Sequence, residues 1–180
     1  MSYGLLKNSI DIPEGVNVTY EDNIMKISGK KGSLTKKFKS TRLNINIGDG
    51  KIEVKCELPR KKESALVGTW TAHIKNMISG VTNGFEYKMK AVYSHFPMKI
   101  NVRGDVLFID NFIGEKVPRK ANIVPGVDVK VKGQEVIVSG IDKERVGQTC
   151  ANIEMATKIR NYDRRVFQDG IYLTERGTHE

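Results

Sequence analysis

Basic and aromatic side chains crowd together near the C-terminus in a pattern that suits contact with nucleic acid. Between residues 158 and 176 they are interleaved with one another: Lys158, Arg160, Tyr162, Arg164, Arg165, Phe167, Tyr172 and Arg176. Arginine bridges phosphates and stacks on bases, and tyrosine stacks or donates a hydrogen bond, so this cluster predicts an RNA-binding surface. A second interpretation is compatible with the first: the segment packs on its own domain, with Phe167, Ile171 and Leu173 facing inward.

Two shorter basic groups are further candidates for phosphate contact. Arg60-Lys61-Lys62 stands where a helix is predicted to begin, and positive charge there opposes the helix dipole unless an anion is bound. Gly29-Lys30-Lys31-Gly32 follows a predicted strand, so it is a hairpin turn with solvated or phosphate-bound lysines and not a KH loop or a P-loop. The candidate RNA-binding residues are Lys30, Lys31, Lys61, Lys62, Lys116, Arg119, Lys158, Arg160, Tyr162, Arg164, Arg165, Tyr172 and Arg176.

The residues that catalysis or metal binding would need are sparse. The histidines are His73, His95 and His179, and no His-x-x-x-His motif occurs. Asp142 and Glu144 resemble a carboxylate pair, but a second helix is predicted to begin there, where the helix dipole favours acidic residues. We therefore expect Asp142 to be an N-cap, and we expect no enzyme activity, no metal and no cofactor.

Both cysteines have a simpler explanation than chemistry. Cys56 alternates with Ile52 and Val54, and Cys150 falls on the apolar stripe of the second predicted helix, so both are predicted core residues. Two cysteines are too few for a disulfide framework, and the sequence shows neither a signal peptide nor an apolar run of about 18 residues. These features predict a cytoplasmic protein without a membrane segment.

The composition agrees with a polyanionic partner. The 180 residues include 30 Lys and Arg against 21 Asp and Glu, for a net charge of +9 and a pI near 9.5. Nucleic acid is the first candidate for such a partner. Residues 1–82 contain 14 basic and 8 acidic residues, whereas residues 83–180 contain 16 and 13. The half with the arginine cluster is therefore the less charged one.

A duplicated pattern supplies the elements that would position these residues. Gly15–Tyr20 and Gly126–Val131 both alternate apolar residues, and 14 residues after each glycine comes a Ser-Gly stop, which predicts two matching hairpins. The helical stretches Val67–Ile74 and Val146–Ile153 also match, but at an offset of 79 instead of 111. The first copy thus holds 32 more residues between its hairpin and its helix.

Periodicity assigns the remaining elements. The predicted apolar face of the first helix is formed by Leu66, Trp70, Ile74, Met77 and Ile78. Residues 80–84 should end this helix. Further strands are predicted at 43–47, 52–58, 87–93, 99–103 and 106–109, the first two joined by Gly48-Asp49-Gly50.

We predict an α+β fold of two duplicated domains, each an antiparallel β-sheet packed against one main α-helix. The first domain is placed at residues 1–82 and the second at 83–180. From about residue 158 onward no clean helix or strand period is found. This C-terminal tail is the part predicted to bind RNA.

Several motifs, in order along almost the whole chain, resemble one family: ribosomal protein six of the large subunit (L-six), in its archaeal and eukaryotic form. They are Ile12–Val16, Lys30–Gly32, Asn76–Phe85, Ser139–Lys143 with Val146–Gln148, Asp163–Phe167 and Asp169–Thr178. The bacterial branch ends differently, in a more basic segment.

The resemblance implies a structural protein with two duplicated α+β domains that binds large-subunit ribosomal RNA. It further implies a position near the sarcin-ricin loop, beside the docking region of translational GTPases, with neighbouring ribosomal proteins as partners. Much of the RNA contact would come from the second domain, which favours Arg160, Arg164, Arg165, Tyr172 and Arg176. A free-standing RNA chaperone or translation regulator is the alternative function.

Overall fold

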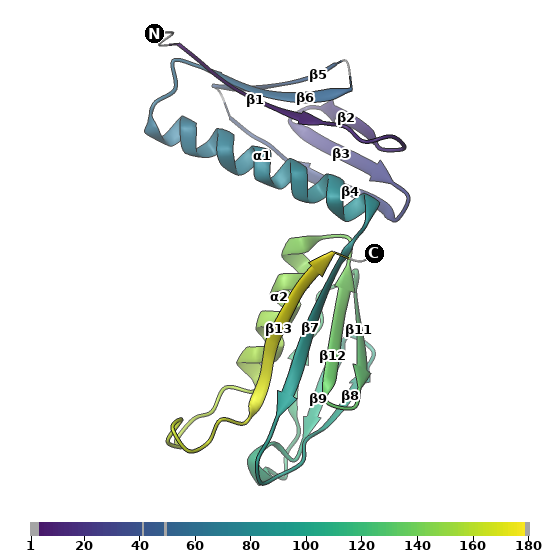
Figure 1. The fold of residues 1–180 in the computed structure, drawn as a ribbon, viewed down its shortest axis with the longest axis vertical. Helices are drawn as coiled ribbons and strands as arrows, with labels where there is room; N and C mark the ends of the chain where they lie inside the picture. The colour runs from purple at the N-terminus through teal and green to yellow at the C-terminus, as the bar shows by residue number, and fades with distance from the viewer. Residues whose placement is uncertain (1–3, 41, 49, 179–180) are drawn as a thin grey trace. The chain divides into compact units, whose positions relative to one another are not determined.

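The computed structural model describes residues 4–40, 42–48 and 50–178, and the chain divides into two compact units, Met1–Asn83 and Gly84–Glu180 (Figure 1). The elements of the first unit are β1 Leu5–Asp11, β2 Asn17–Glu21, β3 Ile24–Gly29, β4 Gly32–Lys37, β5 Leu43–Gly48, β6 Lys51–Glu57 and α1 Lys61–Thr82. Those of the second are β7 Phe85–Val92, β8 Lys99–Arg103, β9 Val106–Asp110, the 3₁₀ turn η1 Phe112–Gly114, β10 Arg119–Asn122, β11 Val127–Lys132, β12 Glu135–Gly140, α2 Lys143–Ala156 and β13 Gly170–Thr178. Among the described residues, no helix is long and apolar enough to cross a membrane.

The first unit packs α1 against two small antiparallel sheets. Their strand orders are β1-β6-β5 and β2-β3-β4, and α1 contacts strands of both. Val67, Ile74 and Val81 of the helix are fully buried. The Phe38 ring meets the Trp70 ring edge-on at a centroid distance of 5.2 Å. The apolar stripe of α1 therefore joins the sheets into one core.

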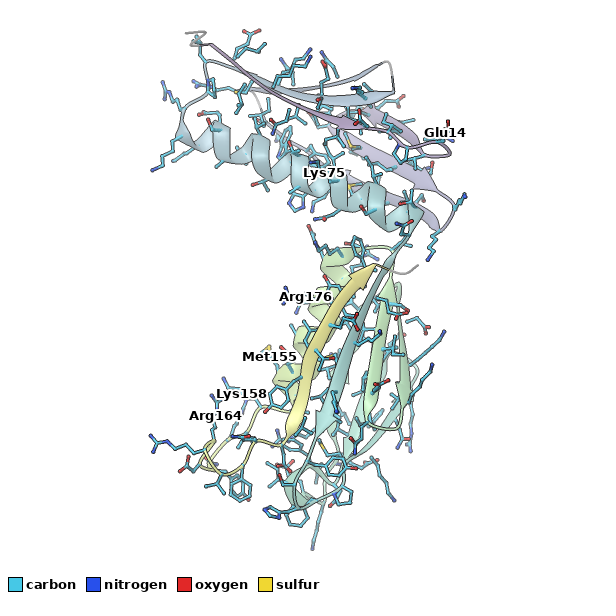
Figure 2. The ribbon with its side chains drawn as sticks, in the orientation of Figure 1. Glu14, Lys75, Met155, Lys158, Arg164 and Arg176 are labelled. Carbon is cyan, nitrogen blue, oxygen red and sulfur yellow. The ribbon has the colours of Figure 1, made fainter. Side chains whose placement is uncertain are left out.

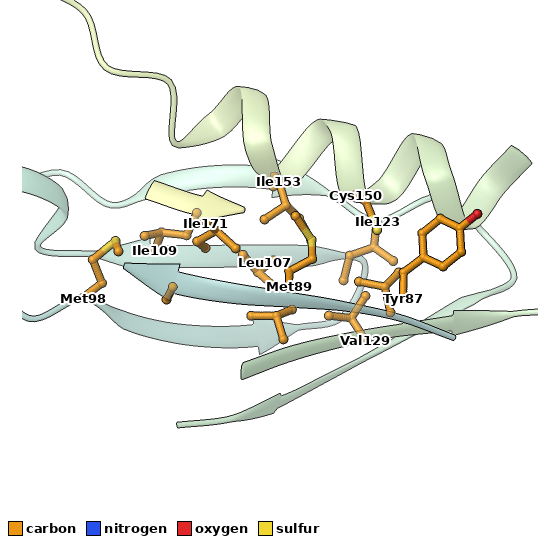
Figure 3. Packing of buried hydrophobic residues seen from close by; sticks show 14 of the residues in the cluster. Tyr87, Met89, Met98, Leu107, Ile109, Ile123, Val129, Cys150, Ile153 and Ile171 are labelled. Atoms are coloured by element: carbon orange, nitrogen blue, oxygen red, sulfur yellow. The ribbon is translucent and has the colours of Figure 1, made fainter. Parts of the chain in front are cut away.

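The second unit repeats this arrangement around α2. Its sheets have the orders β11-β12-β7-β13 and β10-β9-β8. Met89, Leu107, Ile109 and Ile153 are fully buried, and Figure 3 shows these side chains gathered between the strands and α2. The prediction of duplicated sheet-plus-helix domains is confirmed, with the sheet of each unit divided into two.

The second unit repeats the first with its elements in the same chain order. Its strands β11-β12-β7 pair as β5-β6-β1 do, and its sheet β10-β9-β8 pairs as β4-β3-β2 does. Equivalent cross-strand pairs join Ile45 to Val54 in the first unit and Val129 to Val138 in the second. The strand β13 is an addition of the second unit, at the edge beside β7.

This order corrects one of the two offsets found in the sequence. The β11-β12 hairpin, which contains Gly126–Val131 at its start, corresponds to β5-β6 and not to the β2-β3 hairpin that follows Gly15. The hairpins that directly precede the two helices are offset by 84, close to the offset of 79 between the helices. The match at 111 therefore joins strands that are not equivalent, and the 32 additional residues that it implied are not an extra part of the first copy.

One predicted detail of α1 is wrong. Leu66 is 42% exposed, and its neighbour Val67 takes the core position, while the other four residues of the predicted apolar face are buried. The helix ends at Thr82, within the predicted range of 80–84, and is followed by Gly84 at φ +74°. Gly80 is buried and continues the helix; Gly84 supplies the left-handed conformation that follows its end.

The prediction that residues after about 158 lack a strand is wrong for Gly170–Thr178, which form β13 at the edge beside β7. A β-bulge between Leu173 and Glu175 shifts the register, so the alternation that identifies a strand is broken in its middle. Ile171 is 1% exposed, and Phe167 and Leu173 are partly buried against the same core. The interpretation that this segment packs on its own domain is therefore confirmed.

Candidate RNA interface

The loop of residues 158–169, which joins α2 to β13, brings together five of the predicted RNA-binding residues. Their side chains are all exposed: Lys158, Arg160, Tyr162, Arg164 and Arg165. Figure 2 shows Lys158 and Arg164 at this end of the second unit. In the part of the chain that the structure describes, no carboxylate lies within ion-pair distance of these four basic side chains. Their charges are therefore available to an external anion.

At both ends of the helix α2 a side chain accepts a hydrogen bond from a backbone amide. The Glu144 amide donates to Asp142 Oδ1 at 2.9 Å, so the predicted N-cap is confirmed. At the other end Thr157, which is 4% exposed, accepts from the Ile171 amide at 3.1 Å through its hydroxyl oxygen. Because Ile171 is the second residue of β13, this bond ties together the two ends of the loop.

Glu154 accepts a second hydrogen bond that joins the end of α2 to β13. Its Oε1 accepts from the Leu173 amide at 3.1 Å, so the last turn of α2 is bonded to β13 at two successive inward positions. Backbone donors at a β-bulge lose their ladder partners, and the carboxylate replaces one such partner here. The loop between these elements is therefore a closed structure and not a free tail.

Arg119 on β10 fixes the backbone at the start of the 158–169 loop. Its guanidinium donates to the Ala156 and Lys158 carbonyls at 3.0 and 2.9 Å, and to both carboxylate oxygens of Glu115 at 2.8 and 2.6 Å. It also lies 4.2 Å from the centroid of the Phe112 ring. The hydrogen bond from Arg119 lowers the pKa of Glu115. Most of the donors of Arg119 are thus used inside the protein, which suits a positioning role.

Inside the loop, local contacts fix the backbone. Asp163 accepts from the Arg165 amide at 2.9 Å through its side chain and from the Phe167 amide at 2.9 Å through its carbonyl. The rings of Tyr162 and Phe167 lie 4.9 Å apart. Asn161 adopts a left-handed conformation with φ +64°, which asparagine tolerates better than most residues. The arginines are therefore displayed on an ordered turn.

The structure separates Tyr172 from Arg176, although their spacing of four would place them on one face of a regular strand. Tyr172 pairs with Lys90 of β7, whereas Arg176 pairs with Tyr87, three positions away. Since an odd step changes the face of a strand, the bulge at Thr174 turns Arg176 to the face opposite Tyr172. Arg176 thus lies on the side of the sheet that α2 covers, exposed at its edge.

The remaining candidates lie outside this loop. Lys116 is exposed between η1 and β10. In the first unit, Lys30 and Lys31 are exposed in the turn between β3 and β4, where the Lys31 side chain donates to the Asn83 carbonyl after the end of α1. Lys61 and Lys62 are exposed in the first turn of α1, as expected from the helix start. The structure therefore groups the candidates by unit, with the densest group on the 158–169 loop.

Two residues at the end of α2 were missed in the sequence. Met155 is 70% exposed, and Glu154 lies beside it. A large apolar side chain on the polar side of the helical stripe was the available signal, because α2 buries Val146, Cys150 and Ile153 on the other side. The exposed Met155 side chain indicates a binding surface only because the fold places the 158–169 loop next to it.

Cys150 is a core residue, as predicted. Its side chain is 3% exposed, and burial raises the pKa of its thiol to about 12. Such a thiol stays protonated at neutral pH and is a poor nucleophile. Cys56 is likewise buried, at 1% exposure.

Comparison with known proteins agrees with the resemblance in the sequence. The family model described as Ribosomal protein L6 matches residues 12–84 and 96–170, so it matches both units. The large ribosomal subunit protein uL6 of Methanobrevibacter smithii is 50% identical over 168 residues, which cover 93% of this chain and 94% of that protein. A family of ribosomal proteins also supports the expectation of a structural role without enzyme activity. With its two matched repeats and its archaeal relative, this chain belongs to the ribosomal protein L6 family.

Proposed function

We propose that this protein is a structural constituent of the large ribosomal subunit in the cytoplasm, and that it binds large-subunit ribosomal RNA mainly through the 158–169 loop. The observation that carries the proposal is the set of exposed basic side chains on a loop fastened at both ends. Such a surface neutralises phosphates without paying the entropy of ordering a free tail. It positions the protein on RNA by shape and charge, as most phosphate contacts do.

The resemblance to the family adds a location to this proposal. The RNA would be the region near the sarcin-ricin loop, so translational GTPases would dock nearby and neighbouring ribosomal proteins would complete the surroundings. The loop supplies the chemistry that this location requires, since arginine recognises phosphates of folded RNA bidentately and stacks on unpaired bases. The lysines of the first unit, Lys30, Lys61 and Lys62, would add weaker contacts of the same kind.

Crosslinking of the full-length chain to large-subunit ribosomal RNA tests the proposal. Ultraviolet crosslinks identified by mass spectrometry should map to peptides that contain residues 158–172, and chemical probing should show protection around the sarcin-ricin loop. Crosslinks confined to the first unit would contradict the role of the loop. Protection elsewhere in the RNA would contradict the location alone.

Co-sedimentation separates the structural role from the alternative of a free-standing RNA chaperone or translation regulator. A structural constituent should remain with large subunits after a high-salt wash, because buried contacts are screened less than exposed ones. A chaperone that binds by charge alone should be released by the same wash. The loop variant for this experiment is R160Q/R164Q/R165Q, and its matched control is K99Q/K130Q/K132Q on β8 and β11, which removes the same charge and should sediment like the wild type.

A further inference from the structure

A pocket of about 390 Å³ opens between the last turn of α2, the 158–169 loop and the start of β13. This volume lies at the lower end of the roughly 300–1,000 Å³ typical of ligand pockets. The side chains and backbone that line it come from ten residues: Glu154, Met155, Thr157, Lys158, Ile159, Arg164, Phe167, Gln168, Ile171 and Tyr172. Figure 2 labels Met155, Lys158 and Arg164 around this end of α2.

We infer that this pocket binds an unpaired RNA base, and guanine in preference to the other bases. The inference rests on the proposed RNA-binding function and adds to it a specific, non-electrostatic contact. Bases of single-stranded or looped RNA are recognised by stacking on aromatic side chains and by hydrogen bonds to their edges. Both kinds of group are present at the pocket, next to basic side chains for the flanking phosphates.

The apolar wall of the pocket is held in place. The Tyr172 hydroxyl donates to the Gln168 carbonyl at 3.0 Å, and a side chain at Gly170 would meet the Tyr172 ring at 3.1 Å. Gly170 therefore leaves the room that this ring occupies. Tyr172 is 46% exposed and Met155 is 70% exposed, so an aromatic and a thioether surface are both accessible. Aromatic rings and polarizable sulfur are suitable stacking partners for a flat base.

The floor of the pocket excludes water. Ile159 is 9% exposed and Ile171 is 1% exposed, and both belong to the core of the second unit. Phe167 lines one side and is supported by Tyr162, whose ring lies 4.9 Å away. An inserted base would rest on this floor and would bury the solvent-exposed apolar surface of Met155 and Tyr172.

The charges of the pocket discriminate between bases. Lys158 and Arg164 line it and have no ion-pair partner within the described part of the chain, so they are available to phosphates on either side of the base. Glu154 offers only acceptors, one of which already receives the Leu173 amide at 3.1 Å. A carboxylate selects a base edge made of donors, and guanine presents its N1–H and N2–H groups side by side.

Methionine-methyl NMR of the full-length protein tests the inference with two short RNAs. One probe is the tetranucleotide UUGU, and the other is the same chain with an abasic third position. The Met155 methyl resonance, assigned by its loss in Met155→Leu, should shift upfield with UUGU, and the abasic RNA should bind about 5- to 100-fold more weakly. Equal affinity for both RNAs with an unshifted Met155 methyl would overturn the inference.

Two variants separate a base pocket from a charged patch. Glu154→Gln should bind UUGU and UUAU alike, whereas the wild type should favour UUGU; an unchanged preference would contradict the role of Glu154. Met155→Ala should weaken UUGU binding by the same factor at every salt concentration, while the control Val166→Ala, at a 66% exposed loop position outside the pocket, should not.

The base pocket and the proposed function can fail separately. If the protein binds ribosomal RNA but UUGU does not shift the Met155 methyl resonance, the inference of a base pocket is wrong and the proposed function stands. If ribosomal RNA does not bind, both are wrong.

Discussion

Arg119 bonds to Lys158 through the backbone and not through the side chain: the guanidinium donates to the Lys158 carbonyl at 2.9 Å. The Lys158 ammonium remains exposed at the start of the 158–169 loop. Arg119 thus holds the backbone from which Lys158, a proposed RNA contact, extends into solvent.

Arg119→Gln should loosen the loop. The substitution removes charge-assisted hydrogen bonds to two carbonyls and one carboxylate, so the second unit should lose about 2 kcal/mol of unfolding free energy. Urea unfolding measures this loss, and amide hydrogen exchange should speed up in residues 158–169. The neighbouring exposed Lys116→Gln is the control, and equal effects of both substitutions would contradict the positioning role of Arg119.

The bond between Arg119 and Glu115 predicts an acid dependence. The pKa of Glu115 is lowered from its ordinary value of 4.5, chiefly by the hydrogen bond from Arg119. A lowered folded-state pKa stabilises the fold above the ordinary value, and this contribution is lost as the pH falls through the lowered one. The stability difference between wild type and Glu115→Gln should therefore be constant above about pH 5 and should shrink in more acidic solution. A difference that grows on acidification would contradict this assignment.

Thr157→Val should destabilise the junction of α2 and β13. The hydroxyl accepts from the buried Ile171 amide at 3.1 Å, and valine leaves that donor without a partner. An unsatisfied buried donor costs about 1–3 kcal/mol, measurable by thermal or urea unfolding. Thr174→Val is the matched control, since Thr174 is exposed and water can replace its hydroxyl. Comparable losses of unfolding free energy from both substitutions would contradict a stabilising role for the hydrogen bond between Thr157 and the Ile171 amide.

The fold was accessible from sequence where the repeat preserved periodicity. The hairpins around Val18 and Val129, the two helices and the N-cap Asp142 follow local patterns that the structure confirms. The strands β1, β4, β10 and β13 were not assigned. The bulge at Thr174 breaks the alternation of β13, and β10 spans only four residues. The correspondence between strands of the two units also lies beyond a local pattern, because it depends on which strands pair: the hairpin after Gly126 matches β5-β6 and not the hairpin after Gly15.

The candidate site was predictable in composition but not in arrangement. Arginines and tyrosines on residues 158–176 were found by their types alone. The roles of Arg119 and Thr157 depend on contacts between segments 37 and 14 residues apart in the chain. The exposure of Met155 acquires a role only from the loop folded beside it. Net charge alone would place the RNA-binding surface in residues 1–82, because a sum of charges does not show where the basic side chains lie.

The salt dependence of binding to large-subunit ribosomal RNA tests the central claim most directly. Log affinity falls with log salt by about 0.7–0.9 per phosphate neutralised, so R160Q/R164Q/R165Q should reduce the magnitude of that slope by about 2 to 3 relative to the wild type. K99Q/K130Q/K132Q removes the same charge from exposed strand positions and should leave the slope nearly unchanged. A wild-type slope in the arginine variant, or an equal reduction in the lysine control, would contradict RNA binding by the 158–169 loop.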